Sequence, residues 1–118
     1  MKAVLSDIFN QHHAVQFAYL FGSYADGTQH ENSDVDIAVY MEDSSLDARL
    51  ALHHELQKTL QKEIDLVVLN DVKNIYLLEA ILSQGIVLKE HEERAYYEVM
   101  KHHEIIDFKN FRRYIDAA

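Results

Sequence analysis

The sequence contains no cysteine, no proline and no tryptophan, and only 3 of its 118 residues are glycine. Without cysteine, the chain has neither disulfide bonds nor thiolate metal ligands. No apolar run approaches the roughly 20 residues that a membrane-spanning helix needs. The opening segment MKAVLSDIFN also lacks the apolar core and the cleavage site of a signal peptide. We therefore expect a cytoplasmic protein that makes no contact with a membrane.

Positive charge is also scarce, because 11 lysines and arginines face 20 aspartates and glutamates, which gives a net charge of −9. Such a chain repels a phosphate backbone unless it carries a local basic stripe. The densest basic positions, Arg112-Arg113 and the pair Lys58 and Lys62, form no run. We therefore expect no direct binding of nucleic acid. A small anionic substrate remains open if a metal ion supplies the missing positive charge.

The order of helical and strand patterns predicts the fold class. A length of 118 residues favours one domain, which we assign to residues 1–118. Hydrophobic periodicity predicts helices over 2–13, 45–61, 72–83 and 89–116. Strands are predicted over 15–21, 34–40, 63–70 and 85–89, with a short helix or turn over 22–27. This alternation is typical of an α/β or α+β domain with a small mixed sheet and flanking helices.

Side-chain patterns predict where the helices begin and what the C-terminal helix does. The serines of EDSSLD are candidate N-caps for the helix over 45–61, and they precede Leu46, Leu50, Leu56 and Leu60. Asp71 is expected to cap the next helix. The long C-terminal helix carries Tyr97, Met100, Ile105, Phe108, Phe111 and Ile115. We expect it to cover the sheet, with docking to a partner as the alternative, because a small core cannot bury so many large side chains.

Three aspartates interrupt the apolar strands. Asp34 and Asp36 share one face of the strand over 34–40, about 6–7 Å apart, and Asp65 interrupts the strand over 63–70 in the same way. Bare carboxylates in such positions repel one another and resist desolvation. A divalent cation removes this difficulty, and an all-oxygen ligand set suits Mg²⁺ or Mn²⁺. The sequence therefore predicts a metal site at Asp34, Asp36 and Asp65.

Gly22 and Ser23 lie where the first strand ends and a short helix or turn begins. Backbone N–H groups at such a junction can hold a phosphate, and glycine allows the backbone to come close. A phosphate site facing metal-binding carboxylates is what phosphoryl or nucleotidyl transfer requires. By itself, the Gly22-Ser23 pair is also compatible with an ordinary strand-to-helix turn.

Together these residues resemble the nucleotidyltransferase superfamily of DNA polymerase β and the aminoglycoside nucleotidyltransferases. The resemblance depends on Gly22-Ser23, ten intervening residues, Asp34-Val35-Asp36 and a later strand that carries Asp65. It covers about residues 15–88. The short chain is similar to the minimal nucleotidyltransferase (MNT) branch, the MntA-type antitoxins that are paired with HEPN-domain toxins.

The resemblance implies a polymerase β palm-like fold and a Mg²⁺-dependent transfer of AMP from ATP to a tyrosine hydroxyl of a HEPN RNase toxin, which inactivates the toxin. It implies that Gly22 and Ser23 bind the nucleotide phosphates. Asp34, Asp36 and Asp65 would coordinate the metal, with Asp65 also acting as the base. Many relatives have arginine where this chain has Asp26, and an acid beside a triphosphate is unfavourable unless it turns away or binds metal.

Other interpretations stay open beside this one. The chain could be a non-catalytic antitoxin that neutralises its HEPN toxin by direct binding, or a degenerate domain that keeps the motif without turnover. Transfer to a small antibiotic is a further reading, although relatives of that kind carry an added substrate-binding domain. Among the histidines, His30 is the candidate for a nucleotide contact, and the adjacent pairs are interpreted as solvated or boundary residues. Tyr24 is expected either to pack or to stack on a base.

Overall fold

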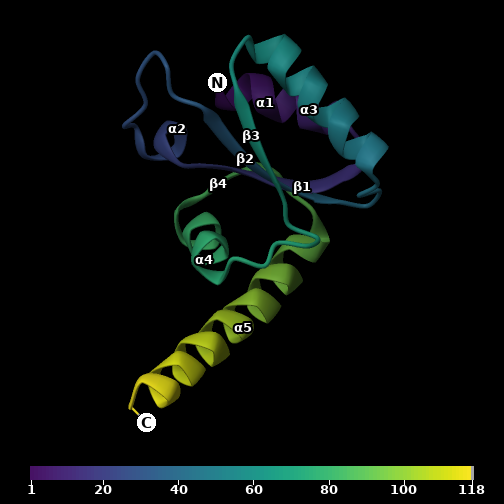
Figure 1. The fold of residues 1–118 in the computed structure, drawn as a ribbon. Helices are drawn as coiled ribbons and strands as arrows, with labels where there is room; N and C mark the ends of the chain where they lie inside the picture. The colour runs from purple at the N-terminus through teal and green to yellow at the C-terminus, as the bar shows by residue number, and fades with distance from the viewer. Residues whose placement is uncertain (118) are drawn as a thin grey trace.

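A mixed sheet carries helices on both faces in the computed structural model, which describes residues 1–117 (Figure 1). The strands are β1 (Val15–Phe21), β2 (Val35–Met41), β3 (Ile64–Val68) and β4 (Ile86–Lys89). The helices are α1 (Lys2–Gln11), α2 (Ser23–Asp26), α3 (Leu46–Leu60), α4 (Ile75–Gln84) and α5 (Glu92–Ala117). Every predicted helix and strand is present, with ends that differ from the prediction by at most three residues.

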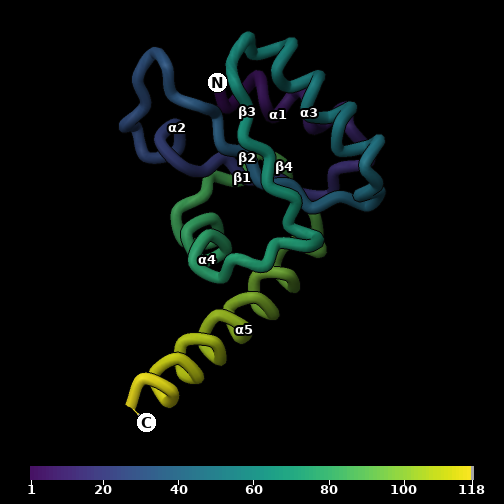
Figure 2. Tube along the Cα trace, in the orientation of Figure 1, coloured from purple at the N-terminus to yellow at the C-terminus, as the bar shows by residue number. Residues whose placement is uncertain are grey.

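The four strands lie in the order β3-β2-β1-β4. β1 runs antiparallel to both β2 and β4, whereas β2 and β3 are parallel and are joined through α3. The predicted small mixed sheet is therefore confirmed. β3 and β4 form the two edges, and the path of the chain between the layers can be followed in Figure 2.

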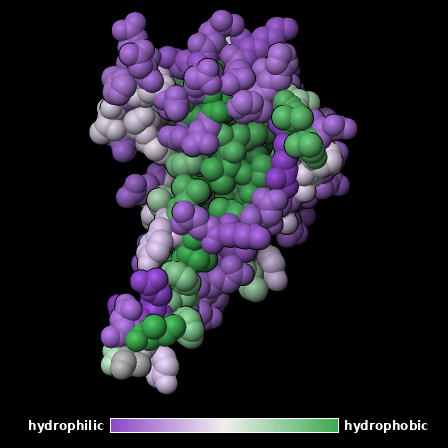
Figure 3. Space-filling view, viewed as in Figure 1, coloured by the Kyte–Doolittle hydropathy of each residue, from purple (hydrophilic) through white to green (hydrophobic). Residues whose placement is uncertain are grey.

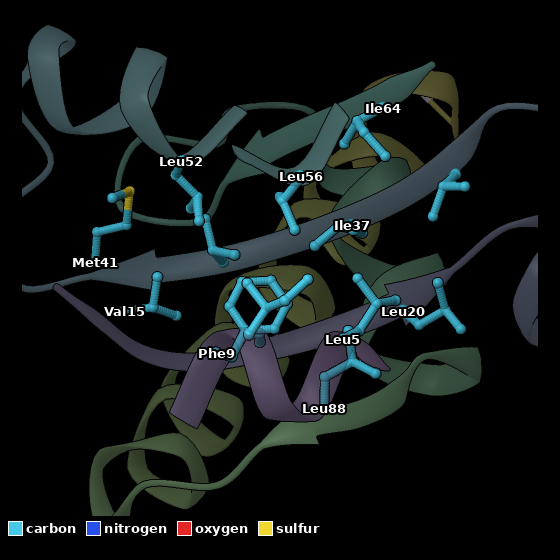
Figure 4. Packing of buried hydrophobic residues seen from close by; sticks show 14 residues of the cluster. Leu5, Phe9, Val15, Leu20, Ile37, Met41, Leu52, Leu56, Ile64 and Leu88 are labelled. Atoms are coloured by element: carbon cyan, nitrogen blue, oxygen red, sulfur yellow. The ribbon is translucent and has the colours of Figure 1, made fainter. Parts of the chain in front are cut away.

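Alternation along the strands divides the core into two layers, as the strand pattern of β2 predicts. Val35, Ile37 and Val39 face α1 and α3, where Phe9, Leu52 and other apolar side chains close over them (Figure 4). Ala38 and Tyr40 face the opposite layer, which α4 and α5 cover. The side of β2 that carries Asp36 is therefore the side of α4 and α5.

Only some of the leucines that predict α3 are buried. Leu46 and Leu50 are 69% and 57% exposed, and the helix instead buries Leu52 and Leu56, with Leu60 partly buried. At about 100° per residue, Leu46 and Leu50 lie roughly 100° around the helix from the stripe formed by Leu52, Leu56 and Leu60. One stripe packs on the sheet and the other therefore stays in solvent.

The predicted N-cap is present in α3 but not in α4. The Ser45 side chain accepts a hydrogen bond from the Ala48 N–H and begins α3 as predicted. The predicted cap at Asp71 is wrong, because Asn74 accepts the N–H groups of Tyr76 and Leu77 and begins α4. Asp71 instead forms a salt bridge with Arg49, 2.8 Å away.

The long helix α5 covers the sheet only with its first half and then extends away from the body (Figure 1). Tyr97 and Ile105 are buried, and the Tyr97 hydroxyl donates to the Leu69 carbonyl at 3.0 Å. Large apolar side chains farther along this helix, among them Phe111 and Ile115, are at least half exposed. The prediction that this helix covers the sheet is thus confirmed for its first half and wrong for the rest.

Within residues 1–117, no helix combines the length and the apolar character that crossing a bilayer demands.

Candidate active site

The parallel register of β2 and β3 places Asp36 opposite Asp65. Residues directly opposite each other in a sheet point to the same face, so both carboxylates lie on the side of α4 and α5. Asp34 precedes the first residue of β2 and is exposed, as is Asp65, while Asp36 is half-buried. The sheet therefore brings together two of the predicted carboxylates by pairing and holds the third just outside β2.

The carboxylates repel one another at this position. The pKa of Asp36 rises to about 6, chiefly because burial disfavours the charged form. The charge and hydrogen bonding of Asp65 and then the charge of Asp34 raise it further. Both other predicted ligands thus act on Asp36, and a cation in their midst would relieve this repulsion.

Gly22 lies directly against the Asp36 carboxylate. Its backbone has φ +70° and ψ −152°, and a Cβ atom at this position would lie 2.1 Å from Oδ2 of Asp36. Any other residue would collide with the carboxylate, so only glycine brings the chain this close. The predicted glycine and the predicted metal-binding aspartate therefore belong to one site.

The short helix α2 holds the segment after Gly22 in place. The Gly22 carbonyl accepts the N–H groups of Ala25 at 3.0 Å and Asp26 at 3.2 Å. The helix ends at Gly27, whose φ of 82° reverses the chain. Ser23 is therefore the first residue after the contact with Asp36 and is fixed beside the carboxylates.

The Asp26 side chain forms hydrogen bonds within its own loop. Its Oδ1 accepts the Thr28 N–H at 2.9 Å and the Thr28 hydroxyl at 2.5 Å, and these bonds lower the pKa of the Asp26 carboxyl. Tyr24 packs against the core layer of α1 and α3, which favours the packing interpretation of this residue. His30 is exposed in the next loop, where its N–H donates to the Ser33 hydroxyl at 2.9 Å.

Lys62 lies near the site, although its sequence context did not indicate a functional role. It lies in the turn before β3 and lines a hollow of about 220 Å³ together with Ser33 and Asp34. Its Nζ lies 5.8 Å from the centre of the Tyr24 ring. Lys62 is a single lysine between the end of α3 and the start of β3, and no sequence motif marks it. Only the fold shows that it lies near Asp34.

The donor set fits a magnesium ion that arrives with a nucleotide. Within residues 1–117, no group of three or more His, Cys, Asp and Glu side chains is gathered closely enough to hold a metal ion alone. Mg²⁺, however, commonly takes one or two carboxylates and completes its shell with water and substrate phosphate. Asp36 and Asp65 supply such carboxylates beside the open backbone of Gly22.

Two open spaces lie on either side of this site. One of about 490 Å³ is at the far end of β2, where Phe17, Tyr40 and Tyr97 form an aromatic wall away from the carboxylates. Asp65 itself borders a groove of about 390 Å³ between β3 and α3. The chemistry of the carboxylates, and not the size of the cavity, therefore identifies the candidate site.

Comparison with known proteins agrees with this geometry. Residues 4–94 match the family model "Polymerase beta, Nucleotidyltransferase". The chain is 45% identical over 73 residues to the protein adenylyltransferase MntA of Shewanella oneidensis, a match that covers 60% of this chain and 51% of that protein. The chain thus spans about half the length of this curated relative.

Two solved toxin–antitoxin structures share the fold. A complex with AMP-PNP contains a chain that superposes with a TM-score of 0.79 and 30% identity, covering 98% of this chain and 94% of the other. A mutant MntA–HpeT complex gives a TM-score of 0.79 and 28% identity with the same coverage. With the family match over residues 4–94 and the site at Gly22, Asp36 and Asp65, the chain belongs to the polymerase β nucleotidyltransferase family.

Proposed function

We propose that this chain is an antitoxin that transfers AMP from ATP to a tyrosine hydroxyl of a HEPN-domain toxin and thereby inactivates it. The observation that carries the proposal is the contact of Gly22 with Asp36, which is itself paired with Asp65. The name of the Shewanella relative and the AMP-PNP in the similar toxin–antitoxin complex support the choice of nucleotide and partner. We further propose that residues 1–118 act as one minimal nucleotidyltransferase domain.

The backbone at Gly22 and Ser23 would hold the triphosphate beside the carboxylates. Asp34, Asp36 and Asp65 would hold Mg²⁺, which when bound neutralises phosphate charge and polarises the α-phosphate. The acceptor oxygen attacks the α-phosphorus and forms the new P–O bond. The bond between the α- and β-phosphates breaks, and pyrophosphate leaves with its electron pair. Asp65 accepts the hydroxyl proton and passes it to water afterwards.

Lys62 would supply positive charge that the loop after Gly22 lacks. The resemblance implies that many relatives carry arginine at the position of Asp26, and in this chain the Asp26 carboxylate is engaged with Thr28. Lys62 lines the same hollow as Asp34, so its ammonium can approach a phosphate held at the carboxylates. We therefore include Lys62 among the nucleotide-binding residues of the proposed site.

A non-catalytic antitoxin is the second candidate function. It is favoured by the exposed apolar side chains of α5, which include Tyr96, Ile106, Phe111 and Tyr114. Contiguous exposed apolar side chains commonly mark a protein contact. Such an antitoxin would mask its toxin by contact alone and would not need the carboxylates.

Mass spectrometry of the product of the neighbouring gene, which we expect to be the HEPN toxin, separates the two functions when it is co-expressed with this chain. With Mg²⁺ and ATP, the wild-type chain is expected to add one or more AMP groups to the toxin. Asp36→Ala is expected to abolish the mass shift, whereas Asp107→Ala, an exposed aspartate on α5, is expected to leave it unchanged. If the double variant Asp34→Ala/Asp36→Ala still neutralises the toxin, the chain is instead an antitoxin that acts by binding.

A further inference from the structure

The outer edge of β3 lies open next to Asp65. β3 is the terminal strand of the sheet, and its inner side pairs with β2. The Val35 N–H donates to the Glu63 carbonyl at 2.9 Å, and the Leu69 N–H donates to the Val39 carbonyl at 2.7 Å. Because backbone groups alternate in direction along a strand, the groups of Ile64, Leu66 and Val68 point outward.

The carbonyl groups of two of these outward residues already have partners. His53 Nε2 lies 2.9 Å from the Ile64 carbonyl, and the Asp71 N–H donates to the Val68 carbonyl at 3.4 Å. Leu66 lies between them, and among residues 1–117 its N–H and C=O groups have no partner across this edge. An unpaired N–H and C=O on one residue form a template for pairing with another strand.

A groove of mixed polarity runs along this edge. We call it the β3 edge groove; it has a volume of about 390 Å³. Its apolar lining residues are Leu50, Ile64, Leu66 and Val68, and its polar ones are Arg49, His53, Asp65 and Asp71. Its apolar wall on α3 is Leu50, which is 57% exposed although it is large and hydrophobic. Figure 3 shows an apolar surface in the middle of this face, over β3, surrounded by hydrophilic side chains.

The geometry of a sheet connects this groove with the chemistry at Asp65. A strand added to the edge would place one residue opposite Asp65, with its side chain on the face of the carboxylate and a Cβ–Cβ distance of about 5 Å. Its two neighbours in sequence would point to the opposite face, which is the face of α3 and of Leu66. One extended segment can therefore present a hydroxyl to Asp65 and apolar side chains to the groove.

We propose that the β3 edge groove binds an extended segment of the protein acceptor, with its hydroxyl-bearing residue opposite Asp65 and an apolar neighbour beside Leu50. The proposal rests on the proposed function for the reaction that follows binding. Main-chain hydrogen bonds to Leu66 supply sequence-independent affinity, and the groove supplies a preference for apolar residues next to the acceptor. The substrate class is thus a protein segment that becomes a strand when bound.

Leu50→Glu tests the groove, with Leu46→Glu as the matched control. Leu46 is the same residue type on the same helix, is 69% exposed, and lies outside the groove. We expect Leu50→Glu to raise the KM for the toxin about tenfold at saturating Mg²⁺ and ATP, as expected for loss of one buried leucine contact. The affinity for AMP-PNP should not change in either variant, and Leu46→Glu should match the wild type. Equal KM values for the two variants would overturn the proposal.

Hydrogen exchange tests the edge without any transfer reaction. The wild-type chain is mixed with the toxin in a buffer that contains a chelator and no nucleotide. Hydrogen exchange is then followed at single amides. The Leu66 amide should exchange at least tenfold more slowly when the toxin is added, while that of Val67, already directed toward β2, should change little. An unchanged Leu66 amide would overturn the proposal. Protection that appears without toxin as the chain is concentrated would overturn it as well, by assigning the edge to a second copy.

The two failures are distinguishable. If the wild-type chain adds no AMP to the toxin, the proposed function fails, but the exchange experiment contains no nucleotide and still decides the occupant of the edge. If AMP is added and neither Leu50→Glu nor the Leu66 amide responds, the edge proposal alone fails.

Discussion

A Cβ atom on Gly22 would lie 2.1 Å from Oδ2 of Asp36, so the end of β1 and the carboxylate of β2 are in direct contact. This contact joins a backbone suited to phosphate with a side chain suited to metal. It depends on glycine for two reasons, the positive φ of 70° and the absence of a side chain.

Gly22→Ala should therefore abolish AMP transfer and destabilise the fold by about 2 kcal/mol, from strain at positive φ and displacement of Asp36. Gly27→Ala is the matched control, because Gly27 has a φ of 82° but nothing lies within 4 Å of its added Cβ. The control should lose about 1 kcal/mol from backbone strain and keep its activity. Chemical denaturation and the mass-shift assay measure the two effects, and equal activity of the variants would contradict the role of the contact.

Asp36→Asn should make the chain more stable in a chelator while it abolishes transfer. The folded state raises the pKa of Asp36 to about 6 from 3.8, so the charged carboxylate opposes folding. The gain should be about 1 kcal/mol at pH 8, a value reduced for the partial exposure of Asp36, or a few degrees in Tm. The raised pKa means that the charge opposes folding fully above pH 6 and not at all well below 3.8, so the advantage of asparagine should fade between these values. Thermal melts at both ends of this range check the sign, and a loss of stability at pH 8 would contradict it.

Lys62→Met should weaken the binding of Mg²⁺ and AMP-PNP about tenfold, because it removes a charge-assisted contact to phosphate. Lys58→Met removes the same charge from an exposed position within α3 and should leave the affinity unchanged. Titration calorimetry at fixed ionic strength measures both. An equal loss in the two variants would indicate a general effect of net charge and would exclude a specific role for Lys62.

Tyr97→Phe should reduce the free energy of unfolding by about 1–2 kcal/mol, because it leaves the buried Leu69 carbonyl without its donor. The ring itself stays in place beside Phe17 and Tyr40, which lie 5.4 Å from it between ring centres. Transfer activity should persist, since neither Tyr97 nor Leu69 contacts the carboxylates. Urea denaturation measures the loss, and an unchanged midpoint would show that water replaces the hydroxyl.

The sequence was sufficient to predict the strands and the side of β2 on which Asp36 lies, because alternation decides both. It could not predict that Asp36 pairs with Asp65. The register of β2 and β3 depends on how α3, which connects them, packs on the sheet. Leu46 and Leu50 show the same limit for a helix: their spacing is helical, but a second leucine stripe with the same spacing is the one that the sheet buries. Asp71 could cap a helix as well as Asn74, and its salt bridge with Arg49 is visible only in the fold. The prediction of a three-carboxylate metal site stays a prediction.

The pairing of β2 with β3 connects the proposed chemistry of Asp36 and Asp65 with the register of the sheet. A slip of β3 by a single residue would turn Asp65 toward the layer of α1 and α3 and bring a branched aliphatic side chain beside Asp36. The shifted register would bury the ionised Asp65 carboxylate among leucines. The free-energy cost of this burial disfavours the shifted register. The aspartate proposed to serve the reaction would thereby also disfavour misalignment of the sheet.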